Sequence, residues 1–302
     1  EKTGDLNEVQ ILAIKKDLSR LLELEKRKEY IINSIRTQNK LTKELSAEID
    51  AALDLNALED IYLPYKKKRK TKAAVARENG LEPLAKILMK QGAGDIGQFA
   101  KRFISKEINT VEKALSGARF IIGEWIGENA RMRRFVRKFY HREAVLTSKL
   151  VKGKEEEAEK FKDYFDYVEP VKRCRSHRMF ALRRGEELGY LRISMRPPED
   201  QAIQEIESYF LKSDHETAGQ VKLAIKEAYK NSIRPSLENE LRNRTKLKAD
   251  QEAIHVFTKN LRQLLLAAPL PQKRILAIDP GFRSGCKIVC LEETTAIRFL
   301  WL

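Results

Sequence analysis

The sequence predicts a mainly α-helical protein whose last residues form strands. Through most of the 302 residues, apolar side chains recur at every third or fourth position, which is the spacing of amphipathic helices. Around residues 144–198 the pattern becomes mixed, and after Pro269-Leu-Pro271 its period changes to two, as in strands. We therefore expect a multi-helical assembly with long helices and a small mixed segment, followed by the first strands of an α/β domain.

These changes in pattern divide the chain into four regions. We expect a helical region over 1–143, a small mixed α/β segment over 144–198, a long-helix region over 199–270 and an incomplete strand-rich domain over 271–302. Segment lengths and spacings do not recur, so no internal repeat is visible. The first residues are polar and lack both a signal peptide and an initiator methionine, so we expect the chain to be part of a longer protein.

Several of the expected helices have recognisable start or stop signals. Asp54 and Thr71 can accept hydrogen bonds from the first free N–H groups of a helix. Asn79-Gly80 supplies a left-handed C-terminal stop, and Pro83 fits the first turn of the next helix. The expected helices cover residues 5–35, 41–53, 55–62, 72–79, 82–90, 96–104, 110–140, 155–164, 200–211, 216–231 and 236–268, with a further short helix capped by Ser176.

Two of these helices carry long apolar stripes. In the segment 110–140 one apolar seam runs through the whole length, so we expect a single helix. Trp125 and Phe139 lie on this seam, which favours packing in the core over stacking on nucleic-acid bases. The stripe of the first helix begins with Ile11, Ile14, Leu18 and Leu21.

Strands are expected at four places. Residues 145–151 alternate weakly, which fits either a strand or the end of the preceding helix, and residues 190–194 form a strand before two prolines. A buried strand over 274–278 is followed by a tight polar turn and a return strand over 286–291. Cys286 and Cys290 lie four residues apart on one face of that return strand, which favours small core side chains over redox groups.

The net charge of +15 favours a polyanionic partner. Nucleic acid is favoured over a membrane, because the longest apolar run, Leu264 to Ala268, is far too short to span a bilayer. The three cysteines form no CxxC pair and no even set, which indicates a reducing compartment, so we expect a cytoplasmic protein without structural zinc. No sequence motif calls for a cofactor.

The most informative basic cluster lies in a turn between two expected helices. Between Ile61 and Arg77 the chain holds seven lysines and arginines and no acid. A basic turn between two helices has a fixed position, unlike a basic tail, and this favours a phosphate-contacting loop. The alternative is a solvated lysine-rich connector. The candidate phosphate-binding residues are Lys66, Lys67, Lys68, Arg69, Lys70 and Lys72.

Two further basic clusters also lack acids. The second lies between Glu128 and Glu143, where three cations share one helical face and predict a cationic edge opposite the apolar seam. The alternative is an ordinary solvated face of a buried helix. The third lies between Pro170 and Gly185. The candidate residues are Arg131, Arg134 and Lys138 in the second cluster, and Arg173, Arg175, Arg178, Arg183 and Arg184 in the third.

Asp279 is the one candidate for catalysis. An aspartate at the end of a buried strand can help to hold a divalent metal, as in nucleases of the RNase H class. One carboxylate is not enough for a two-metal site, and after Asp279 only Glu292 and Glu293 remain, so we expect no enzymatic activity from this chain. The alternative role of Asp279 is in forming the turn. The four histidines are scattered, and no nucleotide-binding or metalloprotease motif occurs, so no metal site is expected.

Several segments, in order along the chain, resemble the Tex family of bacterial transcription accessory proteins. The segment Leu58-Glu-Asp-Ile-Tyr-Leu-Pro-Tyr-Lys66 is the most specific of them. The others are Thr3-Gly-Asp-Leu-Asn-Glu8, Arg69-Lys-Thr-Lys-Ala73, Gly80-Leu-Glu-Pro-Leu84, Ser176-His-Arg178 and Ile278-Asp-Pro-Gly-Phe-Arg283.

This resemblance implies more than the residue pattern does. It implies helix-turn-helix-like elements and long helices, then a YqgF domain of RNase H-like fold, a helix-hairpin-helix region and an S1 domain, in a multidomain protein that binds nucleic acid and is linked to transcription. By the same resemblance, the chain starts after the family's first helices and ends inside the YqgF domain. Asp279 then matches the YqgF acid, while its partner acids would lie beyond residue 302.

The leading hypothesis is a nucleic-acid-binding scaffold that contacts phosphates without sequence preference and without catalysis. Two alternatives are a metal-dependent nuclease or resolvase of the RNase H-like class that uses Asp279, and a platform for proteins of the transcription or translation machinery. The sequence does not distinguish RNA from DNA, because no strand face rich in aromatic residues is visible.

Overall fold

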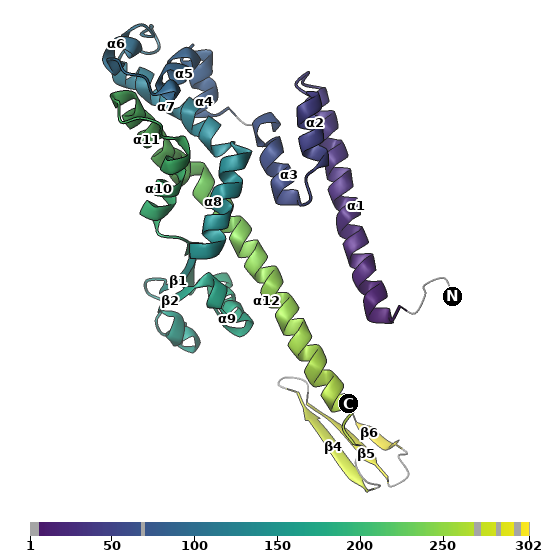
Figure 1. Ribbon diagram of the computed structural model, residues 1–302. Coiled ribbons are helices and arrows are strands. Elements are labelled where there is room, and N and C mark those ends of the chain that lie inside the picture. Colours follow the sequence, from purple (N-terminus) through teal and green to yellow (C-terminus); the bar gives the residue numbers. More distant parts are fainter. Residues whose placement is uncertain (1–5, 68–69, 269–272, 282–284, 293–296, 302) are drawn as a thin grey trace. The chain divides into compact units, whose positions relative to one another are not determined.

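The computed structural model describes residues 6–67, 70–268, 273–281, 285–292 and 297–301, the last range as backbone only. The chain divides into two compact units, Glu1–Ala249 and Asp250–Leu302. The first unit is almost entirely helical with one small sheet, and the second holds the end of a long helix and a second sheet (Figure 1). The predicted mainly α class, followed by strands at the end, is confirmed.

The first three helices share a core of their own. Asn7, Thr42 and Asp54 begin them, and each accepts a hydrogen bond from a backbone N–H of the first turn through its side chain, as N-caps do. The apolar stripe of the first helix is buried only in its second half, since Ile11, Ile14, Leu18 and Leu21 are all exposed. The three helices are α1 (Glu8–Arg36), α2 (Lys43–Asp50) and α3 (Leu55–Tyr62).

A larger core joins the remaining helices of the first unit. In it, α7 packs against α4 and α5 and against α11 (Figure 1). The predicted capping by Thr71 and the left-handed stop at Gly80 are both confirmed. The helices are α4 (Lys72–Glu78), α5 (Glu82–Lys90), α6 (Ile96–Lys101), α7 (Val111–Gly127), α8 (Ala130–Glu143), α10 (Glu199–Phe210), α11 (Glu216–Ala228), the π-helix η4 (Tyr229–Ile233) and, up to Ala249, α12 (Arg234–Leu265).

The segment 110–140 is two helices, so the prediction of a single helix was wrong. The first helix ends at Gly127, and Asn129 begins the second by accepting a hydrogen bond from the backbone N–H of Met132 at 2.8 Å. The apolar seam nevertheless continues across the break, because Ile126, Met132 and Val136 are all fully buried. Apolar spacing therefore identified the buried face of both helices. It did not identify the break between them, which depends on the N-cap at Asn129.

A small antiparallel sheet is attached to the larger core. Its strands are β1 (Val145–Leu150), β2 (Asp166–Pro170) and β3 (Leu191–Arg196) in the order β2-β1-β3, so residues 145–151 form a strand rather than a helix end. Between them lie the 3₁₀ helices η2 (Glu159–Tyr164) and η3 (Val171–Arg173) and the helix α9 (Ser176–Glu187). Ser176 is the first residue of α9 and not its cap; the cap position is Arg175, without a side-chain hydrogen bond.

The second unit contains the end of α12 and the sheet β4-β5-β6, with strands Ile275–Pro280, Cys286–Leu291 and Ile297–Trp301. Pairing of the first two strands is antiparallel, as predicted. The expectation that the first of them is buried was wrong: its side chains are mostly exposed, and Cys286 is exposed as well. The expected boundary Pro269-Leu-Pro271 and residues 282–284 of the predicted turn lie outside the described residues.

Candidate nucleic-acid interface

The lysine-rich turn is anchored at both ends. At its start, the hydroxyl groups of Tyr62 and Ser34 share a hydrogen bond of 2.8 Å, and the Gln38 side-chain amide donates to the carbonyl of Tyr65 at 2.9 Å. At its end, the Thr71 hydroxyl accepts from the N–H of Ala74 at 3.0 Å and so fixes the start of α4. The turn between these anchors is therefore held between two packed elements, as its position between helices predicts.

The described lysines of this turn are exposed. Lys66 and Lys67 have no carboxylate partner among the described residues. Lys70 pairs with Glu78 at 3.0 Å, and because both side chains are largely exposed, this pair adds little stability. The Lys72 ammonium lies 5.1 Å from the centroid of the Phe120 ring on α7. The other two predicted residues of this cluster, Lys68 and Arg69, lie outside the described residues.

The second cluster divides between two faces of α8. Arg131, Arg134 and Lys138 are exposed, so the helix does carry the expected cationic edge. Arg133 and Arg137, from the same basic run, point inward instead. Arg133 is only 4% exposed, so it is not available to contact a phosphate.

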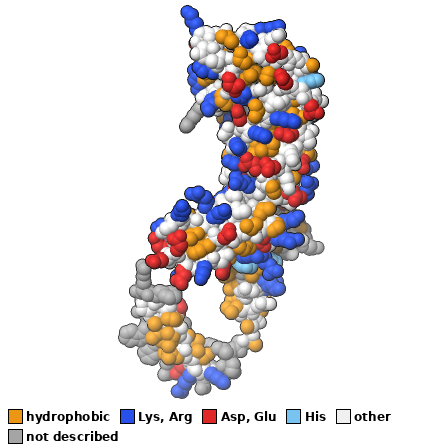
Figure 2. All heavy atoms as spheres, turned by 90° about the vertical axis from the view of Figure 1, so that its left-hand side faces the viewer, with side chains coloured by type: hydrophobic (Ala, Val, Ile, Leu, Met, Phe, Trp, Pro, Cys, Tyr) orange, Lys and Arg blue, Asp and Glu red, His pale blue; other side chains and the backbone are white. Residues whose placement is uncertain are grey.

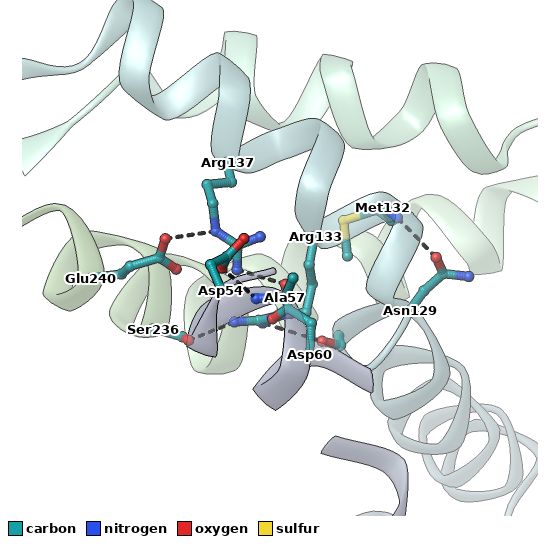
Figure 3. A network of polar contacts seen from close by, with 10 residues as sticks. Asp54, Ala57, Asp60, Asn129, Met132, Arg133, Arg137, Ser236 and Glu240 are labelled. Atoms are coloured by element: carbon teal, nitrogen blue, oxygen red, sulfur yellow. Dashed lines mark hydrogen bonds and ion pairs between the residues drawn. The ribbon is translucent and has the colours of Figure 1, made fainter. Parts of the chain in front are cut away.

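Arg133 and Arg137 bind one buried carboxylate (Figure 3). The Arg133 Nε donates to Asp60 Oδ1 and the Arg137 Nη2 donates to Asp60 Oδ2, both at 2.6 Å. The guanidinium of Arg137 also reaches Glu240 on α12 at 2.6 Å, and that of Arg133 reaches the Ser236 hydroxyl at 2.7 Å. Because Asp60 lies on α3, this network joins the three-helix core to α8 and α12.

The environment of Arg137 favours its charged form. Burial by itself would lower the pKa of this guanidinium, but hydrogen bonds and the negative charges of Glu240 and Asp60 outweigh burial and raise it. A signal for this network was present in the sequence. Arg133 and Arg137 are four residues apart and adjoin the buried Met132 and Val136, so they stand at the border of the apolar seam.

The third cluster is also divided. Arg178 pairs with Glu169 at 3.0 Å and donates to the Tyr167 hydroxyl at 3.1 Å. Burial and a hydrogen bond to Glu169 raise the pKa of Tyr167 to about 12. Arg183 donates to the main-chain carbonyl of Arg242 at 2.5 Å, so it joins α9 to α12. The exposed members of the cluster are Arg173, Arg175 and Arg184.

The exposed cations are distributed over several elements. α8 packs against α3, which precedes the first cluster in the sequence, and against η3 at the start of the third. On the face that Figure 2 shows, lysine and arginine side chains (blue) are interspersed with aspartate and glutamate (red). The positive charge therefore forms several small areas on this face instead of one uniform surface.

The aromatic residues of the seam belong to the core, as predicted. Phe139 is 6% exposed, and Trp125 is partly buried against the main core. The sequence interpretation missed Phe120, which also packs partly against the core but has the Lys72 ammonium near its ring. Phe120 and Lys72 lie far apart in the sequence, so no local pattern could have paired them.

Asp279 lies in β4 near its end, with an exposed side chain, and its register partner on β5 is Lys287. Among the described residues, no three histidine, cysteine, aspartate or glutamate side chains come together in a group that could hold a metal ion. Within the same residues, every helix is too short or too polar to cross a membrane.

The fold and its exposed lysines define a helical scaffold that presents cations at a turn anchored at both ends. A family model described as Tex central region-like matches residues 93–257. The chain belongs to the Tex family.

Curated relatives agree with this assignment. The "Transcriptional accessory protein Tex" of Neisseria gonorrhoeae is 40% identical over 302 residues, and "Protein YhgF" of Escherichia coli is 36% identical over 306, each match covering 97% of this chain. The human "S1 RNA-binding domain-containing protein 1" is 25% identical over 312 residues. The chain spans only 40% of the length of the two bacterial relatives.

Proposed function

We propose that this chain is a nucleic-acid-binding scaffold of a transcription accessory protein in the cytoplasm, and that it contacts phosphates without reading sequence. The observation that carries the proposal is the anchored turn, in which Lys66 and Lys67 are exposed and face no carboxylate among the described residues. The exposed cations of α8 and α9 extend the contact. The names of two relatives, which mention transcription and RNA binding, support the same role.

Reversal of charge in the turn tests the proposal. The double variant Lys66→Glu/Lys67→Glu should weaken binding equally for several unrelated sequences. It should also make the slope of log affinity against log salt shallower by the amount expected for about two phosphate contacts. Fluorescence anisotropy with labelled RNA and DNA at several salt concentrations measures both effects. Lys152→Glu/Lys160→Glu changes net charge equally at two exposed positions outside the clusters and serves as control. Equal losses in the two double variants, or a loss confined to one sequence, would contradict the role of the turn.

We also propose that the chain does not cleave nucleic acid. In the register of the second sheet, Asp279 has a lysine opposite it and not a second acid, which disfavours a pair of metal ions there. Incubation with branched and linear DNA and with RNA in magnesium should give no cleavage. Cleavage that disappears in Asp279→Asn would overturn this part of the proposal and favour the nuclease alternative.

A protein-docking role is the second candidate, and α1 supports it. Ile11, Ile14, Leu18 and Leu21 are 39–54% exposed, although they continue the stripe that is buried in the second half of the helix. Apolar rows of this kind are typical of helix–helix interfaces. Capture of transcription proteins that survives nuclease treatment, and that is lost in Leu18→Glu, would favour this candidate over the first.

A further inference from the structure

A pocket lies beside the lysine-rich turn. Its volume is about 590 Å³, within the range of small-ligand sites. Three parts of the chain form its wall: the turn with the start of α4, the second half of α7, and the end of α11 with the π-helix η4. The residues that matter for its chemistry are Lys66, Lys67, Lys72, Phe120, Asn231 and Ser232.

The acids in this wall have partners within the protein. Glu124 accepts from Arg77 at 2.6 Å, and Glu227 lies 3.8 Å from the Nε of the buried Arg119. Glu128 also interacts within the protein. The second carboxylate oxygen of Glu227 has no hydrogen-bond partner within the described part of the chain, but the wall still holds four cations against three acids. Since Lys66 and Lys67 are exposed and have no carboxylate partner among the described residues, they can bind a phosphate here.

The wall of the pocket also offers an aromatic ring and two polar side chains. Phe120 is partly buried, which keeps its ring in place, and Lys72 lies near the ring without a carboxylate partner among the described residues. Asn231 and Ser232 are exposed on the π-helix, a form that is often found at functional sites. The Phe120 ring can stack on a base, and the amide of Asn231 and the hydroxyl of Ser232 can form hydrogen bonds with its edge. The lysines of the turn can bind the phosphate, so the wall suits one nucleotide.

We propose that this pocket receives one unstacked nucleotide of a single-stranded nucleic acid. Its phosphates bind Lys66 and Lys67, its base lies against Phe120, and the edge of the base meets Asn231 and Ser232. A base within a duplex is stacked on both sides and does not reach such a pocket, so the site selects single strands. The inference rests on the proposed function, because it uses the same turn.

The test compares single strands with duplexes. Phe120→Leu keeps an apolar side chain but removes the aromatic face, and it should lower affinity for an oligouridine or oligothymidine strand by about 5- to 100-fold. Affinity for a duplex of the same length should stay within about twofold, since phosphate contacts remain. Phe135→Leu, at an exposed phenylalanine of α8, is the matched control and should change neither affinity.

A second variant and a spectroscopic probe keep the test decisive. Asn231→Leu alters an exposed pocket residue without touching the core and should also weaken single-strand binding selectively. With 2-aminopurine in the strand, the wild-type protein should raise the fluorescence of an unstacked base, and Phe120→Leu should raise it less. Circular dichroism melting confirms that both variants fold.

The outcomes separate this inference from the proposed function. If Lys66→Glu/Lys67→Glu weakens both kinds of nucleic acid while Phe120→Leu and Asn231→Leu change neither, the pocket inference fails and the proposed function stands. If the lysine variant changes nothing, both fail. Tight binding of free uridine or thymidine monophosphate, with single-strand affinity unaffected by the pocket variants, would identify a small-molecule site and overturn the inference as well.

Discussion

Asp60 holds two arginines of α8, each through one of its carboxylate oxygens. The side chains of Asp60 and Arg133 are both 5% exposed, so neither charge is solvated by water in the folded protein. Removal of one member of such a group is costly because the remaining charge stays buried without compensation. Among the described residues the second carboxylate, Glu240, pairs with Arg137 and with no other cation, so it does not replace Asp60.

Asp60→Asn should lower the free energy of unfolding by about 3–5 kcal/mol, because Arg133 and Arg137 lose their shared counter-charge. Urea denaturation followed by circular dichroism measures the change. Asp54→Ala is the matched control in the same helix, and loss of this N-cap should cost about 1 kcal/mol. An Asp60→Asn variant no less stable than Asp54→Ala would show that the network does not hold the two cores together.

His141 at the end of α8 should titrate below its ordinary range. Burial, and then the positive charges of Arg244 and Arg137, lower the pKa of His141. The folded protein then binds this proton more weakly than the unfolded chain does. The stability contributed by keeping His141 neutral is therefore fully present above about pH 6.5, the pKa of histidine in the unfolded chain. It is lost as pH falls through the lower pKa of His141 in the folded protein.

An NMR titration of the imidazole measures this pKa directly. Arg244→Ala should raise the pKa of His141 because it removes a nearby positive charge, whereas Arg244→Lys should leave the pKa low. A pKa of His141 that is unchanged in Arg244→Ala would mean that burial and the charge of Arg137 account for the shift without Arg244.

The elements pack through close approaches at particular glycines. In α7, a Cβ added to Gly117 would lie 2.2 Å from the Leu81 Cδ1, and Leu81 is only 2% exposed. Gly117 is therefore what allows α7 to lie so near the start of α5. Further along α7, a Cβ on Gly127 would lie 3.3 Å from the Ser232 Oγ, so this helix also approaches the π-helix beside the pocket.

Gly117→Ala should destabilise the protein by about 1–3 kcal/mol, because the buried Leu81 side chain must change position in a filled core. Gly219→Ala in α11 is the control, because nothing lies within 4 Å of its added Cβ. The higher helix propensity of alanine should therefore stabilise the protein by about 0.5–1 kcal/mol. Thermal melts of the two variants should therefore shift in opposite directions. A neutral Gly117→Ala would contradict the close approach of these helices.

At the scale of the whole molecule, the net charge of +15 is divided among positions with different tasks. Some arginines, such as Arg133 and Arg137, neutralise acids within the fold. Others, such as Arg131 and Arg134, stay on the surface. Only the second kind can release counter-ions from a nucleic acid, so net charge overstates the number of phosphate contacts.

The salt dependence of binding measures the number of phosphate contacts, which is smaller than the net charge. With about five to eight phosphate contacts, the logarithm of the affinity should fall with the logarithm of salt with a slope of roughly −4 to −7. Anisotropy titrations between low and physiological salt give this slope. A slope near zero, or no binding at low salt, would exclude a phosphate-binding scaffold. Asp60→Asn should not steepen the slope, provided that Arg133 remains buried.

Most helices could be predicted because their signals are local. Asp54, Thr71 and Gly80 act within one or two turns of their own position, and each does what its residue type favours. The break at Asn129 was missed because an apolar seam that continues across a break looks like one helix. Partners far apart in the sequence, such as Lys72 and Phe120, leave no periodic trace.

The amino-acid sequence by itself determined the helical class, the caps at Asp54 and Thr71, the exposed lysines of the turn and the membership of the Tex family, because these depend on spacing and on residue type. Tertiary structure alone supplied the acids that let some arginines face inward while others face solvent. Arg133 and Arg134 are neighbours with the same charge, yet one is buried against Asp60 and the other is exposed. The physical reason is that burial of a charge requires a counter-charge within hydrogen-bonding distance, and only the folded chain brings residues 60 and 133 together.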